Sequence, residues 1–126
     1  MDKTVIQTNE APAPIGPYSQ AVIAGGFLYI SGQIALNPAS GELVISTVET
    51  ETTLVMQNLQ AILTKAGYDF NHVVKTTIFL TDMNLFAAVN TVYGQFFTAN
   101  YPARETVAVK GLPKGVNVEI SMIAYK

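Results

Sequence analysis

The sequence predicts an α+β protein in which two helices cover one face of a β-sheet. Three observations support this class: two segments space their apolar residues as helices do, several short segments alternate apolar and polar residues, and turn signals separate them. A length of 126 residues suits one domain over 1–126, and a hydrophobic content of 49% is enough for a packed core. The expected order is β-β-β-α-β-α-β-β.

Three strands are expected in the N-terminal part of the chain. Strand-like segments at 18–24 and 27–31 flank the glycine pair 25–26, which is typical of a two-residue hairpin turn. A second turn signal at 37–41 precedes a third strand-like segment at 42–45. An antiparallel arrangement of these strands follows.

The first helix is expected between residues 48 and 66, where apolar residues recur every three or four positions. Ser46 and Glu49 are spaced as a capping box at its start. Gly67 supplies a C-terminal stop, because glycine readily adopts the left-handed conformation that ends helices.

The second helix should begin near Asp82, as its N-cap, and end before Pro102. Strand-like segments at 73–80 and 104–109 flank it, and a right-handed crossover would make these two strands parallel neighbours. A last strand at 117–125 closes the sheet. One face of this helix is expected to carry apolar and aromatic side chains at core spacing, so we interpret them as packing residues. They are Phe86, Val89, Tyr93, Phe96 and Phe97.

Composition and charge narrow the classes of function. The chain has no cysteine, which excludes disulfides, thiolate zinc sites and a cysteine nucleophile. A net charge of −2 with seven scattered basic residues offers no basic surface to nucleic acid or an anionic membrane. The sequence shows neither a signal peptide nor a membrane-spanning segment, so a cytoplasmic protein is expected. Only 13% of the residues are charged, which favours self-association.

Arg104, the only arginine, is the first candidate site residue. Its planar guanidinium suits two parallel hydrogen bonds to a carboxylate or phosphate, although an arginine lying over the sheet surface is the alternative. Residues two apart in a strand point to the same face, and neighbouring residues point to opposite faces. If the apolar residues Val107 and Ile120 face the helices, then Arg104 and Glu119 both point to the uncovered face. If solvent covers that face, they form an ordinary surface pair; if another subunit covers it, they line a crevice.

Several short motifs resemble the RidA (YjgF) family of reactive-intermediate enamine/imine deaminases, from about residue 15 to residue 124. The resemblance implies a chorismate-mutase-like fold with a mixed sheet, a homotrimer and three clefts between subunits. The motifs that carry it are Gly16-Pro17-Tyr18-Ser19-Gln20, Ser31-Gly32-Gln33, Val89-Asn90-Thr91-Val92-Tyr93, Pro102-Ala103-Arg104, Leu112-Pro113 and Val118-Glu119-Ile120.

The resemblance also implies a chemistry. Arg104 matches the family's carboxylate-binding arginine, Glu119 the acidic residue that acts on the hydrolytic water, and Tyr18 the cleft tyrosine, which could donate or relay a proton. The expected reaction converts 2-aminoacrylate, 2-iminopropanoate or 2-iminobutanoate and water to a 2-keto acid and ammonia. This reaction needs no cofactor, and the expected function is part of amino acid metabolism.

Four further positions complete the comparison with the family. Thr106 stands where many members have a cysteine whose main chain contacts the ligand, and Asn90 and Gly32 match cleft-lining positions. Tyr18, Asn90 and Gly32 each also have an ordinary structural interpretation in a strand end, a helix and a turn. Ser121 departs from the family, because many members have a second acidic residue there, and this leaves the substrate preference open.

Other classes of function stay open at this point. A non-catalytic keto-acid-binding regulatory trimer could use the same arginine. A chorismate mutase would need several cations for its dianionic substrate, and a ribonuclease or translation inhibitor would need a basic surface. No metal site is expected, because His72 is the only histidine and a surface role is its simpler interpretation.

Overall fold

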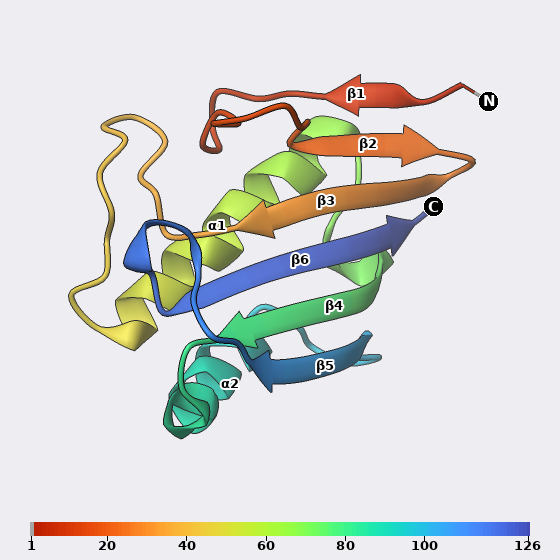
Figure 1. Cartoon of the computed structure of the whole chain (residues 1–126). Coiled ribbons are helices and arrows are strands. Elements are labelled where there is room, and N and C mark those ends of the chain that lie inside the picture. The colour runs from red at the N-terminus through yellow and green to blue at the C-terminus, as the bar shows by residue number, and fades with distance from the viewer. Residues whose placement is uncertain (1) are drawn as a thin grey trace.

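One mixed sheet with two helices on a single face organises the computed structural model, which describes residues 2–126 (Figure 1). Within those residues the sheet has six strands in the order β1-β2-β3-β6-β4-β5, all antiparallel to their neighbours except the parallel pair β4 and β5. The α+β class and the element order are confirmed. The strands are β1 (Thr4–Ile6), β2 (Ala21–Ala24), β3 (Phe27–Gln33), β4 (Val73–Leu80), β5 (Ala103–Ala108) and β6 (Val118–Tyr125), and the helices are α1 (Val48–Ala66) and α2 (Phe86–Gly94).

The N-terminal strands differ from the prediction in one element. The hairpin at Gly25 and Gly26 is confirmed, and both glycines have positive φ angles, as a tight turn between strands requires. The predicted strand at 42–45 is wrong, because within residues 2–126 this segment pairs only through an isolated bridge from Leu43 to Leu36. The first strand is instead β1, which pairs with β2 and is too short to show a clear alternation.

The first helix is confirmed at 48–66, whereas the second begins later and ends earlier than expected. Because α2 ends at Gly94, Phe96 and Phe97 follow the helix and do not belong to it. The predicted capping box at Ser46 and Glu49 is wrong by one residue, since Thr47 is the N-cap and its side chain accepts a hydrogen bond from the Thr50 amide. Asp82 caps a short 3-10 turn, and α2 follows that turn directly. Across residues 2–126, no helix combines the length and the apolar character needed to cross a membrane.

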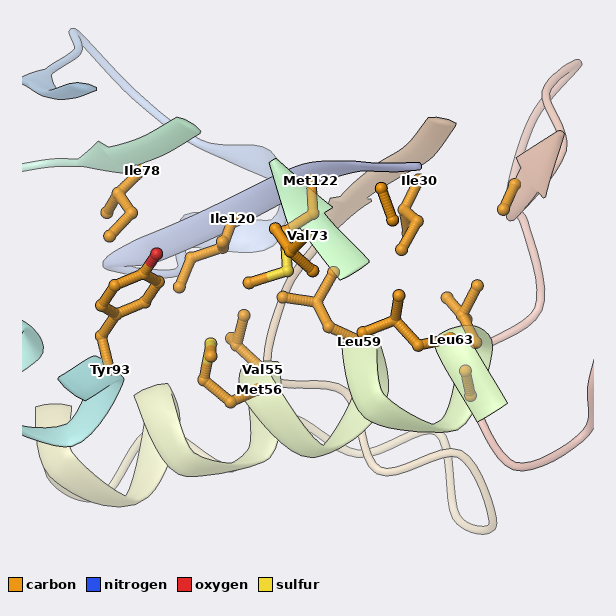
Figure 2. Packing of buried hydrophobic residues seen from close by; sticks show 14 of the residues in the cluster. Ile30, Val55, Met56, Leu59, Leu63, Val73, Ile78, Tyr93, Ile120 and Met122 are labelled. Atoms are coloured by element: carbon orange, nitrogen blue, oxygen red, sulfur yellow. The ribbon is translucent and has the colours of Figure 1, made fainter. Parts of the chain in front are cut away.

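The core lies between the sheet and α1 (Figure 2). Apolar side chains at helical spacing on α1 meet the alternate side chains that β3, β4 and β6 direct toward the helices, and Tyr93 of α2 extends this layer. The residues labelled in Figure 2 are Ile30, Val55, Met56, Leu59, Leu63, Val73, Ile78, Tyr93, Ile120 and Met122.

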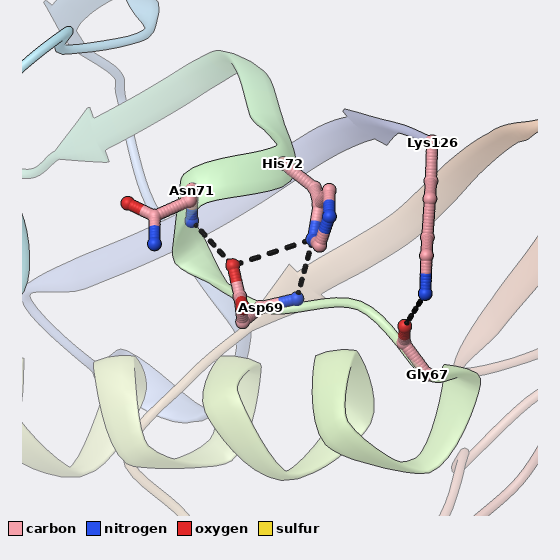
Figure 3. Close-up of polar contacts among 5 residues, drawn as sticks. All are labelled: Gly67, Asp69, Asn71, His72 and Lys126. Carbon is pink, nitrogen blue, oxygen red and sulfur yellow. Dashed lines mark hydrogen bonds and ion pairs between the residues drawn. The ribbon is translucent and has the colours of Figure 1, made fainter.

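Polar contacts hold the connection from α1 to β4 (Figure 3). Gly67 ends α1 with a φ of 84°, and its carbonyl accepts a hydrogen bond from Lys126 Nζ at 2.8 Å. The Asp69 side chain accepts from the Asn71 amide, and the Asp69 amide donates to His72 Nδ1 at 3.0 Å. His72 therefore caps a turn, as its surface interpretation allowed.

The face opposite the helices is open and rich in exposed apolar side chains. Phe27 lies beside Tyr125 and Tyr29, with ring centroids 4.7 and 6.2 Å apart. The strand register places Val5 and Val22 on the same face as Tyr29. Patches of this kind typically mark contacts with another molecule.

The first prediction tests the core. Leu59→Ala removes a fully buried side chain, and we expect it to lower the free energy of unfolding by about 2–5 kcal/mol. The matched control is Gln60→Ala on the exposed side of α1, which should have little effect. Urea unfolding at one protein concentration measures both, and equal losses in the two variants would contradict the assigned packing.

Candidate functional site

All of the sequence-predicted site residues except Thr106 line one of two separate pockets of about 420 Å³ each. The first, which we call the carboxylate pocket, is lined by Tyr18, Gly32 and Glu119 among others. The second, the arginine pocket, is lined by Arg104 and Asn90, together with aromatic residues of α2 and the segment before β5. The two pockets share no lining residue, so one chain does not bring the predicted groups together.

The prediction that Arg104 and Glu119 share a face of the sheet is wrong. In the register of the sheet, Arg104 lies opposite Thr76, which is fully buried under the helices, whereas Glu119 lies opposite Phe79. Thr76 and Phe79 are an odd number of residues apart on β4, so they point to opposite faces. Arg104 therefore points to the helix side and Glu119 to the open side.

The reason for this error is the apolar character of the open face. Val107 was expected under the helices because it is apolar. In the structure, the Val107 side chain is 43% exposed and lies on the open face, opposite Phe79. Alternation separates a strand into two sets of residues but does not say which set is covered. When both sets contain apolar residues, only the packing of the strand in the folded protein decides which set the helices cover.

Arg104 lies against aromatic rings at the side of α2. Its Cζ atom lies 5.0 Å from the ring centroid of Tyr93 and 5.7 Å from that of Phe86. The Tyr93 hydroxyl contacts Thr76 Oγ1 at 3.0 Å, and burial raises the pKa of this phenol, which keeps it neutral. No carboxylate of residues 2–126 forms an ion pair with the guanidinium. The two aromatic rings thus stabilise the Arg104 guanidinium, while its N–H groups have no carboxylate partner within residues 2–126.

Glu119 is the corresponding unpaired anion. Burial raises the pKa of its carboxyl group, and no hydrogen bond or ion pair to this group is found within residues 2–126. Gly32 lies directly against it: a Cβ atom at this position would overlap the Glu119 carboxylate. A half-buried carboxylate with a raised pKa and no partner is suited to accept a proton from a bound molecule.

Tyr18 belongs to the loop before β2, not to the strand that was predicted to include it. Its side chain is 50% exposed, and its hydroxyl accepts a hydrogen bond from the Ile15 amide at 3.4 Å. Gln20, which is buried, shapes this loop, since its side-chain amide donates to the carbonyls of Ala11 and Pro12. Sequence reasoning missed this role of Gln20, because contacts of this kind leave no periodic pattern.

Asn90 lines the arginine pocket, and its part in a cleft stays a prediction. Thr106 follows Arg104 by two residues on the same face of β5, and it lines neither of the two pockets. Its Oγ1 atom is buried without a hydrogen-bond partner in the described chain. Its role at the site stays a prediction. No three histidine, aspartate or glutamate side chains of residues 2–126 gather closely enough to hold a metal ion.

The chain is similar to known proteins over nearly its whole length. Residues 8–126 match the family model described as endoribonuclease L-PSP. Human 2-iminobutanoate/2-iminopropanoate deaminase is 48% identical, with 98% of this chain and 90% of that protein covered. The crystal structure of RidA from an Antarctic Psychrobacter has a TM-score of 0.94 at 43% identity, covering 98% and 99% of the two chains. Escherichia coli TdcF with bound serine has a TM-score of 0.94 at 42% identity, covering 98% of each.

The second prediction follows from the raised pKa of Glu119. Because the unfolded state releases this proton at a lower pH than the folded state, stability falls as the pH rises from the ordinary carboxyl value through the folded pKa. We therefore expect Glu119→Gln to unfold a few degrees above wild type at about pH 8, with little difference at about pH 3.5. Thermal unfolding at equal protein concentrations measures this.

The control for this experiment is Glu42→Gln, which changes an exposed glutamate and should leave the unfolding temperature almost unchanged. A Glu119→Gln variant that is less stable than wild type at about pH 8 would contradict the assigned cause of the shift.

Proposed function

Because this chain belongs to the endoribonuclease L-PSP family, which includes RidA proteins, we propose that it hydrolyses 2-imino acids and their enamine tautomers to 2-keto acids and ammonia. The substrates would be 2-iminopropanoate, its tautomer 2-aminoacrylate, and 2-iminobutanoate. A human relative at 48% identity is named for this reaction, and TdcF was crystallised with serine, which has the same α-carboxylate. The observation that carries the proposal is the pair of unpartnered charged side chains, Arg104 and Glu119, each in a pocket.

Arg104 would bind the substrate carboxylate through both edges of its guanidinium fork. The rings of Tyr93 and Phe86 limit how far this side chain can move, so the carboxylate, and with it the C2 carbon, would be held in one place. Fixing the reacting carbon in this way contributes to the rate by replacing a bimolecular encounter with an oriented one.

Glu119 would accept a proton from a water molecule as its oxygen attacks C2 of the imine. The C=N double bond opens, the nitrogen takes up a proton relayed through the Tyr18 hydroxyl, and a carbinolamine forms. As this intermediate collapses, Glu119 gives its proton to the nitrogen, the carbinolamine hydroxyl returns a proton to Tyr18, a C=O bond forms and ammonia leaves. Tyr18 stands at the rim of the same pocket, where its hydroxyl can relay a proton to the leaving nitrogen.

The proposal includes the homotrimer that the family resemblance implies, since Arg104 and Glu119 of one chain lie on opposite faces of the sheet and only assembly can bring such groups together. In a closed ring, the arginine pocket of one subunit can meet the carboxylate pocket of the next, which gives three equivalent clefts. The exposed apolar face around Tyr29 and Tyr125 supports this arrangement, since contact between subunits would remove it from water.

The family description also names an endoribonuclease activity. The charge distribution does not favour it here: the chain has a net charge of −2 and a single arginine, which offers little to a phosphate backbone. A binding protein for keto acids is the alternative that the assay below separates.

The third prediction tests hydrolysis. Imines are generated in situ, and their decay is followed with wild type, Glu119→Gln and Arg104→Lys. We expect Glu119→Gln to lower the rate by about 10²–10⁴-fold while its calorimetric affinity for pyruvate is retained. Arg104→Lys should weaken pyruvate binding by about 10–150-fold, because an ammonium cannot replace the two-pronged contact.

Two results would count against this proposal. Wild type that binds pyruvate but leaves the decay rate at the buffer value would be a keto-acid-binding regulator. Glu119→Gln that hydrolyses as fast as wild type would remove Glu119 from the mechanism, and Tyr18 would then be the next residue to test.

The fourth prediction tests the clefts between subunits. Arg104→Lys and Glu119→Gln chains are co-expressed and purified together, so that mixed rings form. If each cleft takes its arginine and its carboxylate from different subunits, a random one-to-one mixture should recover about a quarter of wild-type activity. Light scattering should report three chains per particle. The control mixes the two separately purified variants without subunit exchange and should stay inactive. A co-expressed mixture as inactive as its components would place the whole site within one chain.

A further inference from the structure

A buried carboxyl group on α1 contacts the start of the strand that carries Glu119. Glu51 is fully buried, in the first turns of α1. Its Oε2 accepts hydrogen bonds from the amides of Asn117 and Val118 at 2.8 and 3.1 Å, and its Oε1 accepts from Asn117 Nδ2 at 2.8 Å. In Figure 1, the N-terminal end of α1 lies beside the start of β6, where these contacts form.

A contribution to stability does not by itself explain why a glutamate is buried at position 51. Burying a carboxyl group is costly, and well-packed apolar side chains are often as stabilising as a buried polar cluster. Glu51 also has no basic partner among residues 2–126. What the three hydrogen bonds provide is a definite position for the backbone of residues 117 and 118.

That position decides where Glu119 points. The Asn117 carbonyl accepts a hydrogen bond from the amide of Thr81, the residue after β4, at 3.1 Å, so Asn117 is held from the end of β4 as well as from α1. β6 begins at Val118, and Glu119 is its second residue. A slip of one residue at this end would turn Glu119 from the open face to the helix face, because side chains alternate along a strand.

A second polar side chain of α1 holds another wall of the carboxylate pocket. Asn58, buried seven residues after Glu51, donates from Nδ2 to the carbonyls of Ile34 and Leu36 at 3.2 and 3.1 Å. Both of these residues line the carboxylate pocket. The buried side of α1 thus contacts the pocket walls through polar groups at two points.

We infer that Glu51 is a positioning residue for Glu119: its hydrogen bonds to Asn117 and Val118 hold the start of β6 so that the Glu119 carboxylate stays beside Gly32. The catalytic consequence rests on the proposed function, whereas the placement of Glu119 does not. Glu51 touches no substrate and acts only through the backbone of β6.

The test compares Glu51→Met, Glu51→Gln and Thr52→Val. Methionine keeps the length of Glu51 but accepts no comparable hydrogen bonds, whereas glutamine keeps one strong acceptor and can pair with a reoriented Asn117 amide. Thr52→Val is the matched control, because Thr52 is also fully buried but its hydroxyl bonds only within α1, to the Val48 carbonyl at 2.7 Å.

Two readouts are measured on each variant: kcat and KM for imine hydrolysis, and the NMR titration of the Glu119 carboxyl carbon, assigned with Glu119→Gln. We expect Glu51→Met to lower kcat by about 10²-fold with little change in KM, since the misplaced group is not the one that binds the carboxylate. Its Glu119 midpoint should move down toward the ordinary carboxyl value as water reaches the group. Glu51→Gln should keep kcat and the Glu119 midpoint close to their wild-type values, and Thr52→Val should change neither of them.

The NMR readout keeps the two proposals separate. If wild type does not hydrolyse imines, the proposed function fails, and the Glu119 titration still decides whether Glu51 positions that residue. No charged side chain of residues 2–126 forms an ion pair with Glu119, and Arg104 of a neighbouring subunit is the same in every variant. A difference in midpoint between variants therefore reports where the Glu119 carboxylate lies.

A folded Glu51→Met with the wild-type Glu119 midpoint would overturn the inference, and so would a Thr52→Val variant that shifts the midpoint equally. If Glu51→Met does not fold, Asn117→Ala removes only one of the three hydrogen bonds and should shift the midpoint in the same direction by a smaller amount. An unchanged midpoint in that variant would overturn the inference as well.

Discussion

The alternation of side chains along β6 is the constraint on which the rest of this structure depends. Ile120 and Met122 are buried beneath α1, and for that reason Glu119 must face the other side of the sheet. The packing that stabilises the fold therefore also determines where the candidate acid–base group lies. Glu51, the polar contact between α1 and this strand, acts at the point where the alternation begins.

The same constraint separates the two charged groups of the candidate site. Arg104 lies on the helix side against Tyr93, whereas Glu119 lies on the open side beside Gly32. Under the proposed function, Arg104 of one subunit and Glu119 of the next would lie in the same cleft of the trimer. The exposed aromatic residues of the open face and the divided pockets then have one common explanation.

The candidate site also carries a cost in stability. Glu119 is half-buried with no partner among residues 2–126, and burial raises its pKa, so its ionised form is disfavoured in the folded chain. Arg104 is supported by rings rather than by a carboxylate. Groups left unpaired in this way weaken the fold slightly but stay available to a ligand, which is the usual compromise of a functional site.

The sequence by itself determined the α+β class, both helices, the hairpin at residues 25–26, the family, and Arg104 and Glu119 as the residues to examine. Those features depend on local patterns, namely apolar spacing, turn residues and short motifs. Only the tertiary structure decided that Arg104 and Glu119 point to opposite faces, since alternation defines two sets of residues but not which set is covered. It alone revealed the contact between Glu51 and Asn117, because a hydrogen bond between residues 66 positions apart leaves no pattern in either segment.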